Sequence, residues 1–343
     1  MIGWYVHHHG FGHVTRMRAV QPHLTEPVTV FSSLAAPDGL PADVTWIRLE
    51  ADADPIPTPD GGRIDPAHRD PTAGGALHWA PIGHPGHRRR LATIAGWIAQ
   101  NDVSAFVVDV SVEVTAFVRL LGVRTVVMAQ PGDRTDVPHR LAYDLADRIV
   151  APWAEGVIDA VALQERGDRV TYVGGISRFD GRAPVADGGN AVGGGGKRVL
   201  FLGRTLDDER VDATVAGLHA RGWRADLAGT RGCDARVDDV WSALGQSHVV
   251  VSAAGQNSIA DLAAAGAAAV VIAQDRPFDE QRHTARVLDA RGLALTAPDT
   301  VSPDALVDLI ERAAASASVA PDWTTWRVDG AARRAARAIE GTT

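Results

Sequence analysis

The sequence predicts an α/β protein with two doubly wound domains, and three observations support this prediction. Short apolar, β-branched runs alternate with longer amphipathic patterns along the whole chain. Runs such as Phe106-Val107-Val108 are apolar on both faces, which is typical of parallel strands covered by helices. The chain has 343 residues, more than the roughly 150 of one ordinary domain.

The first half of the chain alternates predicted strands and helices up to Ala151. Between them, the segment Asp52–Asp70 is rich in Pro, Asp and Gly, which predicts a long surface loop. The predicted strands are Ile2–Val6, Val28–Ser32, Val44–Leu49, Ala105–Asp109, Arg124–Met128 and Arg148–Ala151, and the helices are His13–His23, Gly86–Gln100, Val112–Leu121 and His139–Leu145.

A glycine-rich stretch, Asp187–Gly196, separates the two halves and predicts a flexible linker. We therefore expect a first domain over 1–180, a linker over 181–197, a second domain over 198–325 and a C-terminal helix within 326–343 that packs back on the first domain. In the second half the predicted strands are Arg198–Leu202, Ala225–Ala228, His248–Ser252 and Ala269–Ala273, and the helices are Asp208–Arg221, Gln256–Ala265, Glu280–Arg291, Pro303–Ala315 and Ala331–Glu340.

Composition excludes several classes of protein. The net charge of −8 argues against a protein that binds nucleic-acid phosphates. A single cysteine, Cys233, rules out an internal disulfide framework. The longest uncharged apolar run, Leu262–Ala273, is 12 residues, shorter than the about 20 that a spanning helix needs. The N-terminus has no basic segment before its apolar run, so we expect a cytoplasmic protein without a signal peptide.

One segment leaves a membrane contact open. Arg88, Arg89 and Arg90 precede a helix with apolar residues at helical spacing, which suits docking at the inner face of the cell membrane. The alternative, which we prefer, is a helix whose apolar side faces the core.

The loop after the first strand carries the first candidate site. Gly10 and Gly12 permit a close approach of ligand to backbone, and a helix begins near His13. His13 and Arg16 share one face of that helix, and an imidazole suits proton abstraction from a hydroxyl near neutral pH. Because position 15 is Thr, the loop lacks the third glycine of a dinucleotide-binding fingerprint, so we disfavour an NAD enzyme.

Asp109 ends a central strand and is the candidate carboxylate partner of His13, with a strand-end cap as the alternative. We expect His7, His8 and His9 to be solvated, and we expect no metal site, because adjacent side chains on a strand end point in alternate directions.

A second candidate site follows the strand that ends at Ser252. Gly255, Gln256, Asn257 and Ser258 form a loop and first helical turn whose N–H groups and hydroxyl suit phosphate oxygens. Asp261 lies one turn further along and suits a ribose diol, with an ordinary surface acid as the alternative.

Together the two loops resemble the GT-B glycosyltransferases, most closely the MurG-like family that uses UDP-sugars. The resemblance rests on Gly10-x-Gly12-His13-x-x-Arg16 and on the run from Ser252 through Gly255, Ser258, Asp261 and Gly266 to Glu280-Gln281. Asp261 stands where the family has Glu, one methylene longer, and Arg204 replaces a second glycine.

The resemblance implies two Rossmann-like domains facing each other across a cleft. It also implies that Ser258 contacts the diphosphate, Asp261 the ribose and Gln281, beside Glu280, the donor sugar. Gly203, Arg204 and Thr205 match a loop where a hydroxyl meets phosphate, and Arg178 matches a phosphate-binding arginine. No cofactor is implied beyond the nucleotide-sugar.

We therefore expect a metal-independent glycosyltransferase that moves a sugar, such as an N-acetylhexosamine, to a hydroxyl acceptor, either lipid-linked or a secondary metabolite. Two alternatives stay open: a nucleotide-sugar hydrolase or epimerase of the same fold, and a non-enzymatic nucleotide-sugar-binding protein.

Overall fold

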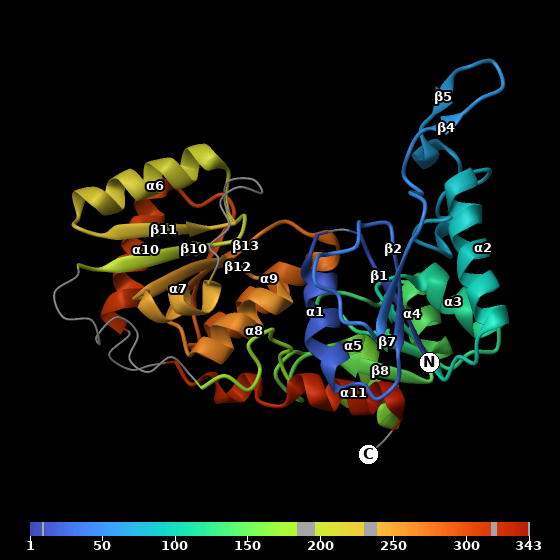
Figure 1. Ribbon diagram of the computed structural model, residues 1–343. Helices are drawn as coiled ribbons and strands as arrows, with labels where there is room; N and C mark the ends of the chain where they lie inside the picture. The colour runs from blue at the N-terminus through green and yellow to red at the C-terminus, as the bar shows by residue number, and fades with distance from the viewer. Residues whose placement is uncertain (9, 184–195, 230–238, 317–320, 342–343) are drawn as a thin grey trace. The chain divides into compact units, whose positions relative to one another are not determined.

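The computed structural model describes residues 1–8, 10–183, 196–229, 239–316 and 321–341, which form two compact units (Figure 1). Unit 1 comprises Met1–Pro152, Ala160–Tyr172 and Arg333–Thr343. Unit 2 comprises Trp153–Asp159 and Val173–Ala332. The C-terminal segment from Arg333 thus belongs to unit 1, and most of the expected linker lies outside the described residues.

Unit 1 is built on a parallel seven-stranded sheet of order β3-β2-β1-β6-β7-β8-β9. Its central strands are apolar on both faces, and every residue of β1 and β6 is buried. The order reverses between β1 and β6, and in such sheets ligands bind at that point, beyond the carboxyl ends of the strands. The strands are β1 (Ile2–Val6), β2 (Val28–Ser32), β3 (Val44–Arg48), β6 (Ala105–Asp109), β7 (Thr125–Met128), β8 (Arg148–Ala151) and β9 (Val170–Tyr172).

Helices α2 and α3 pack on one face of this sheet through an aromatic core. Phe31 stacks on Phe106 at 5.6 Å between ring centroids, and Trp97 of α2 meets both rings edge-on. The three arginines therefore lie within a core-facing helix, the alternative preferred above, and Arg90 is itself buried against Asp52. The helices of this unit are α1 (Gly12–Val20), α2 (Pro85–Gln100), α3 (Val112–Leu120), α4 (Val137–Leu145), α5 (Val161–Gln164) and the greater part of α11 (Ala331–Glu340), with 3-10 turns η1 (Gln21–His23), η2 (Pro66–His68), η3 (Ala73–Gly75) and η4 (Gly167–Arg169).

Unit 2 is built on a parallel five-stranded sheet of order β11-β10-β12-β13-β14. Apolar side chains of α6 and α10 cover one face of it, among them Leu218, Leu306 and Ile310. The elements are β10 (Arg198–Leu202), α6 (Asp208–Ala220), β11 (Arg224–Ala228), α7 (Val240–Gln246), β12 (Val249–Ala253), α8 (Gln256–Ala265), β13 (Ala269–Ala273), η5 (Pro277–Asp279), α9 (Glu280–Ala290), β14 (Leu295–Pro298), α10 (Pro303–Ser316) and η6 (Trp323–Trp326).

The segment Asp52–Asp70 is more ordered than the expected loop. It contains an antiparallel hairpin of β4 (Ile56–Pro57) and β5 (Arg63–Ile64), followed by η2. Two-residue strands are too short to produce a period-two pattern, so composition alone favoured a loop. Among the described residues, no helix has the length and apolar character needed to cross a membrane.

Candidate functional site

Two adjacent strands of unit 1 end side by side and bring His13 next to Asp109. Strands β1 and β6 pair with Val6 opposite Asp109, so the chain leaves both strands at the same edge of the sheet. Helix α1 begins at Gly12, and its first turn carries no side-chain cap. His13 Nδ1 lies 3.0 Å from Asp109 Oδ1, which is the contact predicted from the sequence.

Asp109 is a fully buried carboxylate held in its ionised form. Arg16 Nη1 lies 3.5 Å from the oxygen that His13 contacts, and Arg16 is itself only 3% exposed. Burial alone would raise the pKa of Asp109, but the charge of Arg16 and the contact with His13 outweigh burial and lower this pKa. An ionised Asp109 accepts the Nδ1–H of His13, which leaves Nε2 of the ring as the proton acceptor.

The backbone directly after Asp109 is strained. Val110 has a φ of 68°, in the left-handed region that a β-branched residue rarely adopts. Such strain persists only where the surrounding structure imposes it, and it concentrates at functional sites. Val110 also lines a cavity of about 120 Å³ in unit 1, together with His7, Glu113 and Arg134.

The histidines after β1 differ from the expectation of alternate directions. The rings of His7 and His8 stack, with centroids 4.7 Å apart and an interplanar angle of 14°. Strand β1 ends at Val6, so the alternation of a pleated strand no longer governs these two residues. The ring of His7 also meets that of His13 edge-on at 5.9 Å, while His9 lies outside the described residues.

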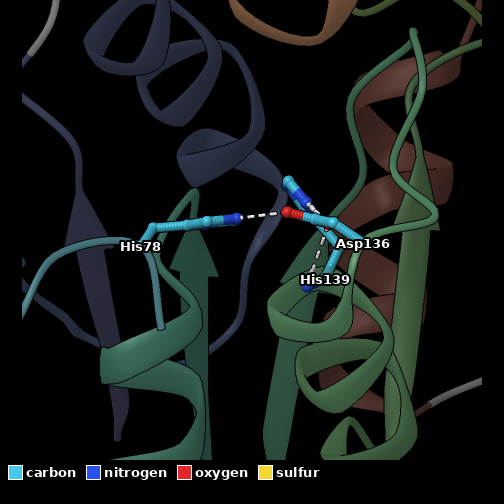
Figure 2. Close-up of side chains that lie close together, drawn as sticks. All are labelled: His78, Asp136 and His139. Carbon is cyan, nitrogen blue, oxygen red and sulfur yellow. Dashed lines mark hydrogen bonds and ion pairs between the residues drawn. The ribbon is translucent and has the colours of Figure 1, made fainter. Parts of the chain in front are cut away.

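A second polar cluster borders the same cavity, and the sequence did not reveal it. Figure 2 shows His78, Asp136 and His139 pointing toward one another. His78 Nε2 lies 2.7 Å from Asp136 Oδ2, and His139 Nδ1 contacts the other carboxylate oxygen. His78 and Asp136 are 58 residues apart, so no local spacing connects them.

The surroundings of His139 keep its ring neutral. Burial and the charge of Arg134 lower the pKa of His139 to about 4, although Asp136 acts in the opposite direction. Arg134 Nη1 lies 3.1 Å from His139 Nε2, and a guanidinium can only donate, so Nε2 accepts and the ring proton lies on Nδ1.

In unit 2, hydrogen bonds join the segments that follow strands β10 and β13. Gln274, just beyond β13, donates its Nε2 to the carbonyl of Arg204 at 2.7 Å and lies 3.2 Å from that of Thr205. Its own N–H donates to Gln281 Oε1 at 3.0 Å. Gln281 is therefore buried and engaged within the protein, whereas the resemblance implied contact with the donor sugar.

The structure contradicts the predicted surroundings of Asp261. The residue is 3% exposed, accepts from Ser177 Oγ at 2.7 Å and accepts from Arg178 Nε at 2.9 Å. Burial raises its pKa, against the opposing charge of Arg178. Both carboxylate oxygens thus bind protein groups, so the alternative of an ordinary surface acid is wrong, and a ribose would have to displace Ser177 or Arg178 to reach this carboxylate.

The other residues predicted to bind the nucleotide-sugar include those that follow strands β10 and β12. Gly203 has a positive φ of 72°, and the hydroxyl of Thr205 is buried without a hydrogen-bond partner. Gly255 caps α8 without a side-chain hydrogen bond, so the first turn offers backbone N–H groups. Gly255, Gln256, Asn257, Ser258 and Glu280 are half-buried, while Gly10, Gly12, Arg178 and Arg204 are exposed.

Comparison with known proteins finds a family match within the second unit. Residues 236–322 match the family model described as glycosyltransferase family 28 C-terminal domain. This part of the chain is similar to the C-terminal domain of family 28 glycosyltransferases. This match and the fold confirm the predicted resemblance to MurG-like GT-B glycosyltransferases and support an enzyme that transfers sugar.

Solved structures show the same fold along the whole chain at low identity. The kitacinnamycin glycotransferase is 17% identical, with a TM-score of 0.67 over 99% of this chain and 98% of the other. MurG of Acinetobacter baumannii is 14% identical, with a TM-score of 0.65 over 99% of both chains. A spinosyn rhamnosyltransferase complexed with thymidine diphosphate is 18% identical, with a TM-score of 0.59 over 97% of this chain and 98% of the other. A search of curated protein sequences finds no significant match.

Proposed function

We propose that the chain transfers a sugar from a nucleoside-diphosphate sugar, a UDP-sugar in the first instance, to a hydroxyl acceptor, with no metal at the leaving group. The observation that carries this proposal is the contact of His13 Nδ1 with the buried carboxylate of Asp109. Asp109 fixes the tautomer of His13 and stabilises the imidazolium that forms when Nε2 takes a proton.

The proposed reaction balances without a cofactor. His13 removes the hydroxyl proton of the acceptor, the acceptor oxygen bonds to the anomeric carbon, and the bond from that carbon to the diphosphate breaks. The diphosphate leaves with an additional negative charge, which cationic and N–H donors must offset.

Unit 2 offers such donors. Arg178 is 41% exposed along its side chain, and Asp261 holds it through Nε. The buried hydroxyl of Thr205 and the first turn of α8, with Ser258, add donors that suit phosphate oxygens. In this proposal Asp261 positions Arg178, and the role of ribose ligand that the resemblance implied for Asp261 is dropped.

The test separates donor binding from chemistry. Calorimetric titration with UDP, thymidine diphosphate, GDP and CDP, without added metal, should give binding that Thr205→Val weakens and His13→Ala leaves unchanged. His13→Ala should abolish transfer to any acceptor that the native chain uses. No nucleoside diphosphate binding by the folded protein would refute the donor site.

The nature of the acceptor is tested in the same assay. A spinosyn rhamnosyltransferase is complexed with spinosyn aglycone, and the MurG-like resemblance of the sequence implies a lipid-linked acceptor, so both classes belong in the acceptor panel. Release of free sugar at a catalytic rate in the absence of any acceptor would favour a hydrolase instead.

A further inference from the structure

We propose that His78, Asp136 and His139 form a binding site for a divalent transition-metal ion in unit 1. The candidate ligand atoms are His78 Nε2, a carboxylate oxygen of Asp136 and His139 Nδ1, and all of them lie within 4.8 Å of one another. A metal with bonds of about 2.0–2.2 Å needs ligand atoms roughly 3.4 Å apart in tetrahedral geometry, so small side-chain shifts suffice.

The donor set determines the class of ion. Two imidazole nitrogens and one carboxylate oxygen are typical of zinc sites that retain an open position, and of other first-row metals, whereas magnesium and calcium prefer all-oxygen ligands. His78 and His139 both line the cavity of about 120 Å³, which has room for a water molecule or a ligand oxygen at the open position.

The fold holds the three side chains in place without an ion. Asp136 caps α4 by accepting the backbone N–H of His139, so the helix start fixes both residues (Figure 2). Glu113 accepts the backbone N–H groups of His78 and Trp79 at 2.7 and 2.9 Å, which anchors the segment that carries the third ligand. Such supporting contacts are what orient the ligands of metal sites.

Arg134 opposes metal binding by His139, and this opposition can be tested with a variant of Arg134. Its contact with His139 Nε2 places the ring proton on Nδ1, which is the atom the metal needs. Binding must therefore move this proton to Nε2, where it faces the guanidinium of Arg134. Replacing Arg134 with Gln removes the charge and supplies a carbonyl that accepts the Nε2 proton, so Arg134→Gln should bind metal more tightly than the native chain.

The experiment is a calorimetric titration of the tag-free full chain with Zn²⁺ and with Co²⁺, whose visible absorption reports coordination by nitrogen. We expect one ion per chain, no response to Mg²⁺, and affinity lower by about tenfold or more in Asp136→Asn and in His78→Gln, because each loses a ligand charge or donor. Asn also caps helices well, and the His78 side chain is 31% exposed, so both variants should fold, which circular dichroism checks.

Two controls separate this site from other histidines. His68→Gln, at an exposed position of the same unit, should leave affinity unchanged. His8→Gln tests the stacked pair after β1 as a competing site. The proposal is overturned if the native chain binds neither Zn²⁺ nor Co²⁺, or if His8→Gln abolishes binding that His78→Gln retains. The ion has no role in the proposed departure of the diphosphate, so either proposal can fail alone.

Discussion

Replacing Asp109 with Asn is the most informative perturbation, because it removes a buried charge and changes almost no volume. Asp109 is 0% exposed and contacts both His13 and Arg16. Asn leaves the guanidinium of Arg16, 3% exposed, without this counter-charge. Breaking a buried ion pair in this way costs about 3–5 kcal/mol.

The geometry places the expected cost at the lower end of that range. The separation of Arg16 Nη1 from Asp109 Oδ1 is 3.5 Å, longer than a direct hydrogen bond, so we expect a loss of about 3 kcal/mol in the free energy of unfolding. If His13 is the base, transfer should also slow by about 10²–10⁴, and adding His13→Gln to Asp109→Asn should cost little more.

Urea denaturation measures the loss in the free energy of unfolding. Hydrogen exchange shows whether the destabilised region is that of β1 and β6 or lies in unit 2. Asp102→Asn is the matched control, because Asp102 is exposed and lies in the same unit. A loss below about 1 kcal/mol in Asp109→Asn would refute the buried ion pair as a stabilising contact. Independent, multiplicative losses in the double variant would show that His13 and Asp109 do not act as one group.

Three further predictions concern other parts of the chain. Val110→Gly should change the free energy of unfolding by less than about 1 kcal/mol, because Gly relieves the strained φ. Val108→Gly, in buried strand β6, should cost about 3 kcal/mol or more, and urea denaturation compares the two variants. Burial would raise the pKa of Asp52, but the hydrogen bond with His87 and the charge of Arg90 lower this pKa to about 2. About 1–2 kcal/mol of stability, present above pH 4, should therefore be lost as the pH falls toward 2. In a series of denaturation experiments at different pH, Asp52→Asn should lose this pH dependence of the free energy of unfolding. Asp261→Ala should destabilise unit 2 by about 2 kcal/mol, because Ser177 and Arg178 lose their shared acceptor; a change within 0.5 kcal/mol, roughly that of a surface substitution, would contradict this.

Burial on both faces explains which elements the sequence could predict. The predicted bounds of β1, β6, α8 and β13 agree with the structure, because apolar β-branched runs and an apolar helical stripe bounded by Gly255 and Gly266 leave few alternatives. Helix α7 and strand β14 were missed. Helix α7 spans only seven residues and β14 spans four and ends in proline, so neither carries a clear period.

The sequence predicted the contact between His13 and Asp109 but did not predict the partners of Asp261. His13 and Asp109 were predictable together because each follows the end of a strand, and adjacent parallel strands end at one edge of the sheet. The partners of Asp261 were not, since Ser177 and Arg178 are 84 and 83 residues away and approach it only through tertiary packing. A motif indicates which side chains are available, but not which of them the protein itself already binds.

The inward-facing Asp261 has a consequence for the nucleotide. A carboxylate that accepted both ribose hydroxyls would favour a ribonucleotide over its 2′-deoxy form, since the lost contact leaves a buried acceptor unpaired. In this chain Ser177 and Arg178 occupy both carboxylate oxygens, and Asp reaches one methylene less far than the Glu of the family it resembles. We therefore expect UDP and 2′-deoxy-UDP to bind with affinities within about threefold, as measured by calorimetry. A preference for UDP of about tenfold or more that disappears in Asp261→Asn would show that donor binding breaks the contact with Arg178 and turns the carboxylate outward.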